Sequence, residues 1–116
     1  MALLTAFTPL TTGVVNAGAA VAASDTIDQA TLGARGVFLE IINGNASSDT
    51  VTIKDFGTTA AGNSLASNQY TKSVANGTSQ VFHIKPSMVD PSTGLVTITH
   101  SVTATVTYKM YSLASV

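Results

Sequence analysis

Apolar and polar residues alternate in short segments along most of this chain. The clearest segment is 36–42, in which Val37, Leu39 and Ile41 fall on one face of an extended strand. The other face carries two more large apolar side chains beside a single Glu, so both faces are largely apolar. This pattern predicts a central strand whose surroundings are mostly covered.

Two pairs of alternating segments are predicted to form hairpins. Segment 49–54 follows segment 36–42 after residues 43–48, which are of the types that form tight turns. Segments 69–74 and 79–84 are joined through an Asn-Gly pair, a strong short-range hairpin signal.

The last third of the chain carries the strongest strand signal. Segments 95–100 and 102–111 consist almost wholly of β-branched and aromatic residues, whereas residues 86–94 predict one helical turn and a tight turn. In segment 102–111, Val106 lies on the inward face, and threonines form a ladder on the outward face. The outward threonines are Thr103, Thr105 and Thr107.

These patterns together predict an all-β fold. About seven short strands separated by turns indicate a small antiparallel β-sandwich, either immunoglobulin-like or jelly-roll-like. No helix longer than about two turns is expected. Residues 1–34 are rich in Ala, Gly and Thr, and they predict an extended N-terminal arm plus a first strand. Residues 35–116 predict the β-sandwich domain, so the chain is expected to be a single domain.

The surface of this sandwich is expected to carry few charges. Charged residues make up only 9% of the chain, far below the roughly 25% of an average soluble domain. Thr and Ser supply most of the polar side chains instead, and the net charge is -1. Such a surface has little electrostatic protection against association, so we expect partners to cover much of it. The basic residues are scattered singly, which argues against nucleic-acid binding.

Residues able to perform catalysis are few. The chain has two His, six carboxylates and no Cys, and none of them forms a catalytic or metal-binding motif. On neighbouring strands, His83 and His100 would be able to share a metal with Asp90 or Asp55, but their spacing favours packing or surface roles. We therefore expect no enzyme activity, no cofactor and no metal.

Several other polar residues fit turn chemistry better than ligand binding. Asp25 and Asp28 are expected to cap a turn or to be solvated, because two carboxylates fall far short of a Ca²⁺ cage. Asn45 and Asn76 each begin an N-glycosylation pattern, yet both lie in predicted turns. We expect turn or surface roles for all four.

The N-terminal region contains one apolar stretch, residues 14–23, that superficially resembles a secretory signal. No Lys or Arg precedes Arg35, and polar residues and glycines interrupt the stretch, so no cleaved signal is expected. No apolar run approaches the roughly 20 residues of a membrane span, so no membrane partner is expected either.

The order and spacing of several segments give the whole chain a distinct pattern. They are the Ala-rich residues 15–23, Asp25-Thr26, Arg35 with the strand 37–44, residues 49–53, residues 74–78, the apolar strand before Pro86, residues 94–99 and residues 105–110. This pattern resembles the small β-rich decoration or minor capsid proteins that tailed bacteriophages and prophages encode close to the major capsid gene.

The resemblance implies a structural virion protein that binds the outer surface of a phage capsid and stabilises it. It implies the major capsid protein as partner and the capsid surface of the virion as location. It also implies a homo-oligomer, with a trimer at local symmetry axes as one arrangement. Such chains often end soon after an Arg-Leu pair, whereas this chain continues past Lys109-Met110 to Val116, and its loop 56–69 is long.

Two other functions remain open at this point. The same composition suits another virion component, such as a tail-tube, head-completion or fibre-associated protein. A secreted sugar-binding or adhesive β-sandwich module would need exposed aromatic side chains on one face, and the chain offers three Tyr and four Phe.

Five apolar residues are candidates for partner contact. Leu3, Leu4 and Phe7 stand in a segment without strand or helix period, so a compact monomer has no obvious use for them. Phe56 and Leu65 are the large apolar residues of the long loop after segment 49–54, and its length marks it as a contact segment. The alternative is that the N-terminal arm packs back on its own sandwich as an edge strand.

Overall fold

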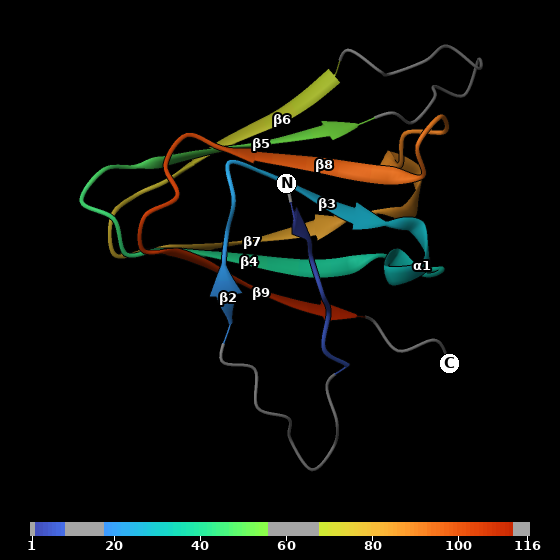
Figure 1. Cartoon of the computed structure of the whole chain (residues 1–116), viewed down its shortest axis with the longest axis horizontal. Coiled ribbons are helices and arrows are strands. Elements are labelled where there is room, and N and C mark those ends of the chain that lie inside the picture. The colour runs from blue at the N-terminus through green and yellow to red at the C-terminus, as the bar shows by residue number, and fades with distance from the viewer. Residues whose placement is uncertain (1, 9–17, 56–67, 113–116) are drawn as a thin grey trace.

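The protein is a sandwich of two β-sheets stacked face to face (Figure 1). The computed structural model describes residues 2–8, 18–55 and 68–112, and it confirms the expected all-β sandwich. The five-stranded sheet has the order β1 (Ala2–Leu3), β3 (Ser24–Asp28), β8 (Leu95–His100), β5 (Asp49–Asp55) and β6 (Asn68–Val74). The four-stranded sheet has the order β2 (Ala19–Ala20), β9 (Val106–Ser112), β4 (Val37–Asn43) and β7 (Ser79–Ile84).

The strand order is that of a jelly roll, one of the two topologies predicted. β2 pairs with β9, β3 with β8, β4 with β7 and β5 with β6, so the chain is one long antiparallel ribbon folded back on itself. Two further antiparallel pairs, β4 with β9 and β5 with β8, close this ribbon into two sheets. The short β1 adds to the five-stranded sheet in parallel, beside β3.

The two predicted hairpins are wrong. β4 and β5 lie in different sheets, and the same holds for β6 and β7 and for β8 and β9. Residues 44–48, 75–78 and 101–105 therefore cross between the sheets, all at the same end of the sandwich (Figure 1). Alternation determines which face of a strand is buried. It does not determine which of the two sheets the strand joins, because both inner faces of a sandwich are apolar.

The threonine ladder expected along residues 102–111 is also corrected. β9 begins only at Val106, which is buried as predicted, whereas residues 101–105 make the crossing. Thr103 and Thr105 are exposed loop residues, and Thr105 has a positive φ of 57°. A chain that must span the roughly 10 Å between two packed sheets has to leave the straight strand at this point.

The core lies between the sheets and is built from alternate residues of each strand. Val37, Leu39 and Ile41 of β4 are fully buried, which confirms the inward face predicted for this segment. Val51 and Ile98 are fully buried on the inner face of the other sheet. Burial of each such side chain contributes about 1.5–3 kcal/mol, so these inner faces supply most of the stabilisation.

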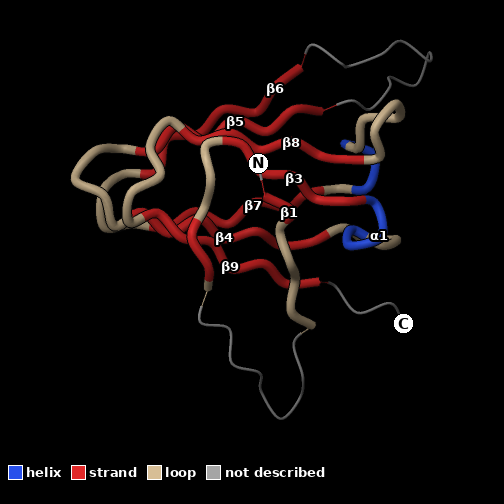
Figure 2. Tube along the Cα trace, in the orientation of Figure 1, coloured by secondary structure: helices blue, strands red, loops and turns tan. Residues whose placement is uncertain are grey.

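Residues 2–8 run along one open side of the sandwich, from one sheet to the other (Figure 2). β1 lies beside β3, and Phe7 pairs with Tyr111 of β9. Between these contacts Leu4 is buried, and its backbone N–H donates to the Thr26 carbonyl oxygen at 2.8 Å. This segment therefore packs on its own sandwich, in agreement with the alternative expectation for the arm.

Two short helical turns lie at the end of the sandwich opposite the crossings (Figure 1). They are α1 (Gln29–Leu32) and the 3-10 turn η1 (Pro86–Met88). Asp28 caps α1, because its Oδ1 accepts a hydrogen bond from the Thr31 N–H at 2.8 Å, so the predicted capping role is confirmed. The predicted tight turn after η1 is confirmed as well, since the Gly94 N–H donates to the Asp90 carbonyl oxygen at 2.7 Å.

Candidate functional site

The outer faces of the two sheets differ in chemistry. On the five-stranded sheet, four neighbouring strands place only hydroxyl side chains in one register row, and exposed Thr50 lies beside this row on β5. Hydroxyl rows of this kind suit a solvated sheet face. The residues of the row are Ser24, Thr99, Thr52 and Thr71.

The four-stranded sheet carries aromatic side chains across its outer face. Phe38 of β4 lies opposite His83 of β7 on one side and opposite Tyr111 of β9 on the other. Phe7 pairs with Tyr111 in turn, at the far edge of β9. Paired residues of neighbouring strands point to the same face, so these four rings form one row across the sheet. We call Phe7, Tyr111, Phe38 and His83 the aromatic row.

The rings of the aromatic row are open to solvent. Phe38 is 41% exposed and Phe7 is 37% exposed, although large apolar side chains are usually buried. The ring centroids of Phe38 and His83 lie 5.3 Å apart with the planes tilted by 59°, a favourable aromatic geometry. His83 is further fixed by its Nε2, which lies 3.0 Å from the Arg35 carbonyl oxygen. The row is therefore a partly apolar surface held on a rigid sheet.

Further side chains extend this surface along the sheet. Val81 on β7 is 64% exposed, more than any other large hydrophobic residue in the described part of the chain. In register with Val81 lie Glu40 on β4 and Lys109 on β9, and Ile42 follows one position further on the same face. An exposed apolar patch with a few charges among its members is typical of a protein contact site.

The sequence did not predict the aromatic row, because its members come from four segments far apart in the chain. Only the jelly-roll pairing of β9 with β4, and of β4 with β7, brings them together. One signal was present in segment 36–42, where Phe38 and Ile42 make the second face largely apolar as well. This pattern predicts a central strand that is mostly covered. β4 is indeed central in its sheet, but its outer face is open.

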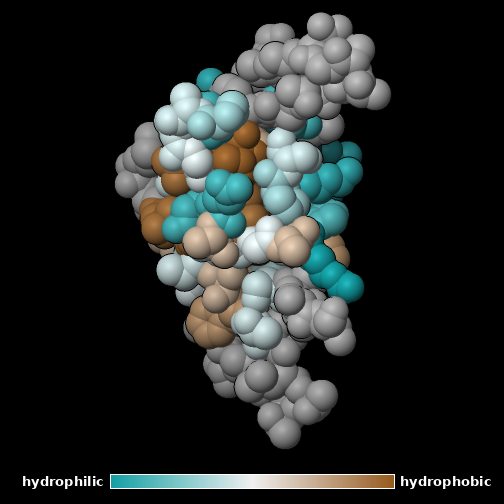
Figure 3. All heavy atoms as spheres, turned by 90° about the vertical axis from the view of Figure 1, so that its right-hand side faces the viewer, coloured by the Kyte–Doolittle hydropathy of each residue, from teal (hydrophilic) through white to brown (hydrophobic). Residues whose placement is uncertain are grey.

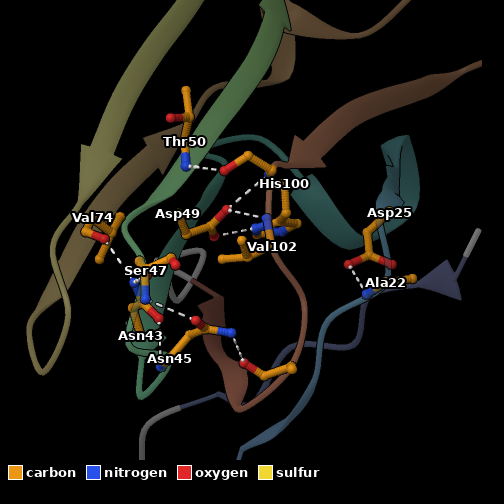
Figure 4. A network of polar contacts seen from close by, with 12 residues as sticks. Ala22, Asp25, Asn43, Asn45, Ser47, Asp49, Thr50, Val74, His100 and Val102 are labelled. Atoms are coloured by element: carbon orange, nitrogen blue, oxygen red, sulfur yellow. Dashed lines mark hydrogen bonds and ion pairs between the residues drawn. The ribbon is translucent and has the colours of Figure 1, made fainter.

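A buried Asp–His hydrogen bond lies where β5 and β8 meet the crossing loops (Figure 4). His100 Nδ1 lies 2.7 Å from Asp49 Oδ2, and both side chains are almost completely buried. Asp49 Oδ1 accepts hydrogen bonds from the backbone N–H groups of Ser101 at 3.0 Å and Val102 at 3.4 Å. The carboxylate thus fixes the start of the crossing between β8 and β9, which is a structural role.

Three asparagines tie the three crossings together, and Asn43 and Asn45 are labelled in Figure 4. Asn43 Nδ2 donates to the Val74 carbonyl oxygen at 2.8 Å, and Asn45 Nδ2 donates to the Ala104 carbonyl oxygen at 2.9 Å. Asn76 Nδ2 donates to the Asn45 carbonyl oxygen. The asparagines of both glycosylation patterns are therefore engaged in turn contacts, as predicted.

The two histidines lie in different environments. His83 is on the outer face of the four-stranded sheet, whereas His100 points into the core from the five-stranded sheet, so they do not converge on a shared metal. Across residues 2–8, 18–55 and 68–112, no group of three or more His, Cys, Asp or Glu side chains is placed to hold a metal ion. His100 Nε2 and Asp25 Oδ1 are buried without a hydrogen-bond partner.

The five predicted contact residues fall in three different settings. Leu3 is 54% exposed on β1, and Phe7 belongs to the aromatic row. Leu4 is a core residue, so the expectation that it serves a partner is corrected. Phe56 and Leu65 lie outside the described residues.

Two cavities open at the end of the sandwich that carries α1 and η1. One has a volume of 520 Å³ and lies between the N-terminal segment and α1, with Leu3 and Leu32 in its lining. The other has a volume of 370 Å³ and is lined by residues that include Phe82, His83 and Met88. Hydrophobic atoms reach the surface at this end of the molecule, between hydrophilic groups (Figure 3). The aromatic row thus ends, at His83, beside the second cavity.

Two carboxyls at turns have lowered pKa values. Hydrogen bonds from the side chain and the backbone N–H of Thr31 lower the pKa of Asp28 below its ordinary value. Hydrogen bonds from the backbone N–H and the hydroxyl of Ser92 lower the pKa of Asp90 in the same way. Each carboxylate therefore stabilises its own turn.

Comparisons with known proteins do not assign the chain to a family. No protein-family model, no curated protein and no solved structure matches it. Within the described residues, no helix has the length and apolar character needed to span a membrane. The function is therefore inferred from the pattern of the chain and from its surfaces.

Proposed function

We propose that this protein is a structural virion component that binds the outer surface of a phage capsid and stabilises it. The order and spacing of its segments, which resemble those of decoration and minor capsid proteins, support the proposal. Its small number of charges and its jelly-roll sandwich support it too, since viral capsid domains often have this fold. One fold serves many functions, so a specific surface of this sandwich has to account for the binding.

The aromatic row is the observation that carries the proposal. Rigid aromatic side chains lose little conformational entropy on binding, and they often dominate the energy of protein interfaces. Glu40 and Lys109 beside the row offer charged contacts that would orient a partner. A broad sheet face suits a broad partner surface, and the major capsid protein is the partner that we propose for it.

Leu3 is a separate case among the exposed apolar residues. It lies on β1, at the edge of the other sheet, and is not part of the aromatic row. We therefore assign the shell contact to the aromatic row and expect Leu3 to contribute little to it.

The test compares one ring with one hydroxyl on the opposite outer face. Phe38→Ala removes the ring at the centre of the aromatic row, and Thr50→Ala is the matched control on the five-stranded sheet. Binding to capsids that lack the protein is measured by co-sedimentation, and thermal melting checks the fold of each variant. We expect Phe38→Ala to bind roughly tenfold more weakly or worse, and Thr50→Ala to bind like wild type.

Two results would contradict this assignment. Wild-type occupancy by a folded Phe38→Ala, Tyr111→Ala double variant would remove the aromatic row from the mechanism. Wild-type protein that does not bind capsids but associates with phage tails would favour a tail-tube or fibre-associated role instead.

Carbohydrate binding is the second candidate function, and the aromatic row favours it. Sugar rings stack on exposed aromatic faces, and jelly-roll sandwiches also occur among lectins. A secreted sugar-binding or adhesive module requires exposed aromatics on one face, and the exposed rings of Phe38 and Phe7 fit that requirement. Saturable binding of wild-type protein to polysaccharide on a glycan array, lost in Phe38→Ala, would favour this function over capsid binding.

A further inference from the structure

The sheets differ in how their edges are protected against pairing with another strand. Exposed edges of natural sheets are commonly very short or carry charged side chains, because an unprotected edge is a template for pairing. In the described residues, the edge strands β1 and β2 have only two residues each. The longer edge strand β6 carries the exposed Lys72. These three edges are therefore protected.

β7 is the exception. It is an edge strand of six residues that, among the strands the structure describes, pairs with β4 on one side only. Its sequence Ser-Gln-Val-Phe-His-Ile contains no Lys, Arg, Asp, Glu, Pro or Gly. Val81, near its middle, is 64% exposed, and Phe82 is only partly buried. The strand thus combines a free edge with one exposed apolar side chain, that of Val81, and lacks charged, Pro and Gly residues.

We propose that β7 pairs antiparallel with β7 of a second copy of this chain. A two-fold axis perpendicular to the sheet, passing between the two strands, would join both four-stranded sheets into one continuous sheet. The pairing would give the free backbone groups of β7 hydrogen-bond partners and, with the axis beside Val81, bring the Val81 side chains of both copies together on the shared outer face.

The absence of charged side chains on β7 favours a second copy over an unrelated partner. A two-fold axis places the same strand against itself, so any Asp, Glu, Lys or Arg near the axis would meet its own like charge. β7 contains none of these, and the whole chain has a net charge of only -1, so two copies repel each other little. The strand is therefore compatible with itself.

The geometry of this dimer also concerns the aromatic row. A two-fold axis perpendicular to a continuous sheet keeps the outer faces of both copies on the same side, so the two aromatic rows would point in one direction. Two linked contact faces bind one surface more tightly than either face alone. The dimer itself does not depend on what the aromatic row binds.

The test measures the oligomeric state of the full chain by sedimentation. Wild-type protein is expected to dimerise, and Val81→Lys is expected to raise the dissociation constant by at least roughly tenfold, because it places a charge at the axis. Thr50→Lys adds the same charge on the outer face of the other sheet and is expected to dimerise normally. Val81→Ile keeps a β-branched apolar residue and is also expected to dimerise.

Hydrogen exchange provides an independent measurement. The β7 amides that do not bond to β4 are expected to exchange more slowly as the protein concentration rises, and this effect is expected to vanish in Val81→Lys. A wild-type chain that stays monomeric at high concentration, a trimer, or a Val81→Lys variant that dimerises as well as wild type would overturn the proposal. Monomeric protein that still binds capsids through Phe38 would overturn the dimer alone, and a dimer that ignores capsids would overturn the capsid function alone.

Discussion

Two buried aspartates of the five-stranded sheet show how strongly a single charge depends on its neighbours. Asp49 is met by His100 Nδ1 and by two backbone N–H groups, so both of its oxygens are engaged. Asp25 accepts a hydrogen bond from the Ala22 N–H at 3.1 Å through Oδ2, while its Oδ1 is buried without a partner. A buried polar group stabilises the fold only where it is hydrogen-bonded, so Asp49 is expected to matter more than Asp25.

Replacing Asp49 tests this difference. Asp49→Ala is expected to lower the free energy of unfolding by about 3–5 kcal/mol, because it leaves the His100 ring and two N–H groups without their acceptor. Urea unfolding followed by circular dichroism measures the change. Asp25→Ala is the matched control and is expected to lower the free energy of unfolding clearly less. Equal losses would contradict the structural role of the hydrogen bonds to Asp49.

Gly36 and Gly77 form a second pair of residues that can be compared directly. Both have positive φ, 84° and 73°, a conformation that costs an alanine about 1–2 kcal/mol. A Cβ at Gly36 would also collide with the Ile84 carbonyl oxygen, whereas a Cβ at Gly77 meets open space. Gly36→Ala is therefore expected to destabilise the protein by at least about 1 kcal/mol more than Gly77→Ala. Equal melting temperatures of the two variants would mean that the loop before β4 can move away from β7.

The elements at the edges of the sandwich show which parts of the N-terminal region belong to the fold. Residues 2–8 contact both sheets, and the Tyr108 hydroxyl, reaching out of the core, accepts a hydrogen bond from the Thr5 N–H at 3.2 Å. The segment is thus a structural closure of one open side, and only its outward residues are available to partners.

Leu3 and Leu4 are neighbours that test this closure. Leu4→Ala is expected to lower the free energy of unfolding by about 2–5 kcal/mol, because Leu4 is 2% exposed and its removal leaves a cavity. Leu3→Ala is expected to change it by less than about 0.5 kcal/mol, because Leu3 is 54% exposed. Chemical denaturation of both variants checks the contrast, and similar small effects would mean that the segment detaches in solution.

The N-cap of α1 predicts a dependence of stability on pH. The lowered pKa of Asp28 means that its charged form stabilises the folded state, so this contribution is present above the ordinary pKa of Asp and is lost as the pH falls through the lowered value. Asp28→Ala is expected to lower the free energy of unfolding by about 1 kcal/mol at neutral pH and by progressively less in acid. Asp28→Asn, which can still cap, is the control; a pH-independent cost of Asp28→Ala would contradict the assignment.

Strand patterning could be predicted from the sequence, but strand partners could not. The inward positions of Val37, Leu39 and Ile41 could be predicted from alternation alone, because every second side chain of a strand points to the same face. The same alternation allowed a hairpin between β4 and β5, although residues 44–48 carry the chain to the other sheet. Buried Asn43, which fixes that crossing through Val74, looks in the sequence like an ordinary turn residue.

At the scale of the whole molecule, the sandwich separates two surface chemistries. One outer face presents the hydroxyl row and the other presents the aromatic row, so the two outer faces are suited to different surroundings. That division could not be predicted before the topology, because Phe38 and Tyr111 become neighbours only when β9 inserts beside β4. If the aromatic face binds a shell, the hydroxyl face with Thr52 and Thr99 is left facing solvent.

The pairing of early strands with late ones also determines when this chain can fold during its synthesis. β8 lies between β3 and β5, and β9 lies between β2 and β4, so neither sheet can close before the last two strands have left the ribosome. Until then the nascent chain exposes the apolar faces of β3, β4 and β5 to the cytosol and its chaperones. Ribosome-stalled chains that have emerged only to residue 94 are expected to remain protease-sensitive, and resistance is expected only once β9 has emerged. Folding of the sandwich therefore waits for β9, and the earlier strands can aggregate on the ribosome until that strand has emerged.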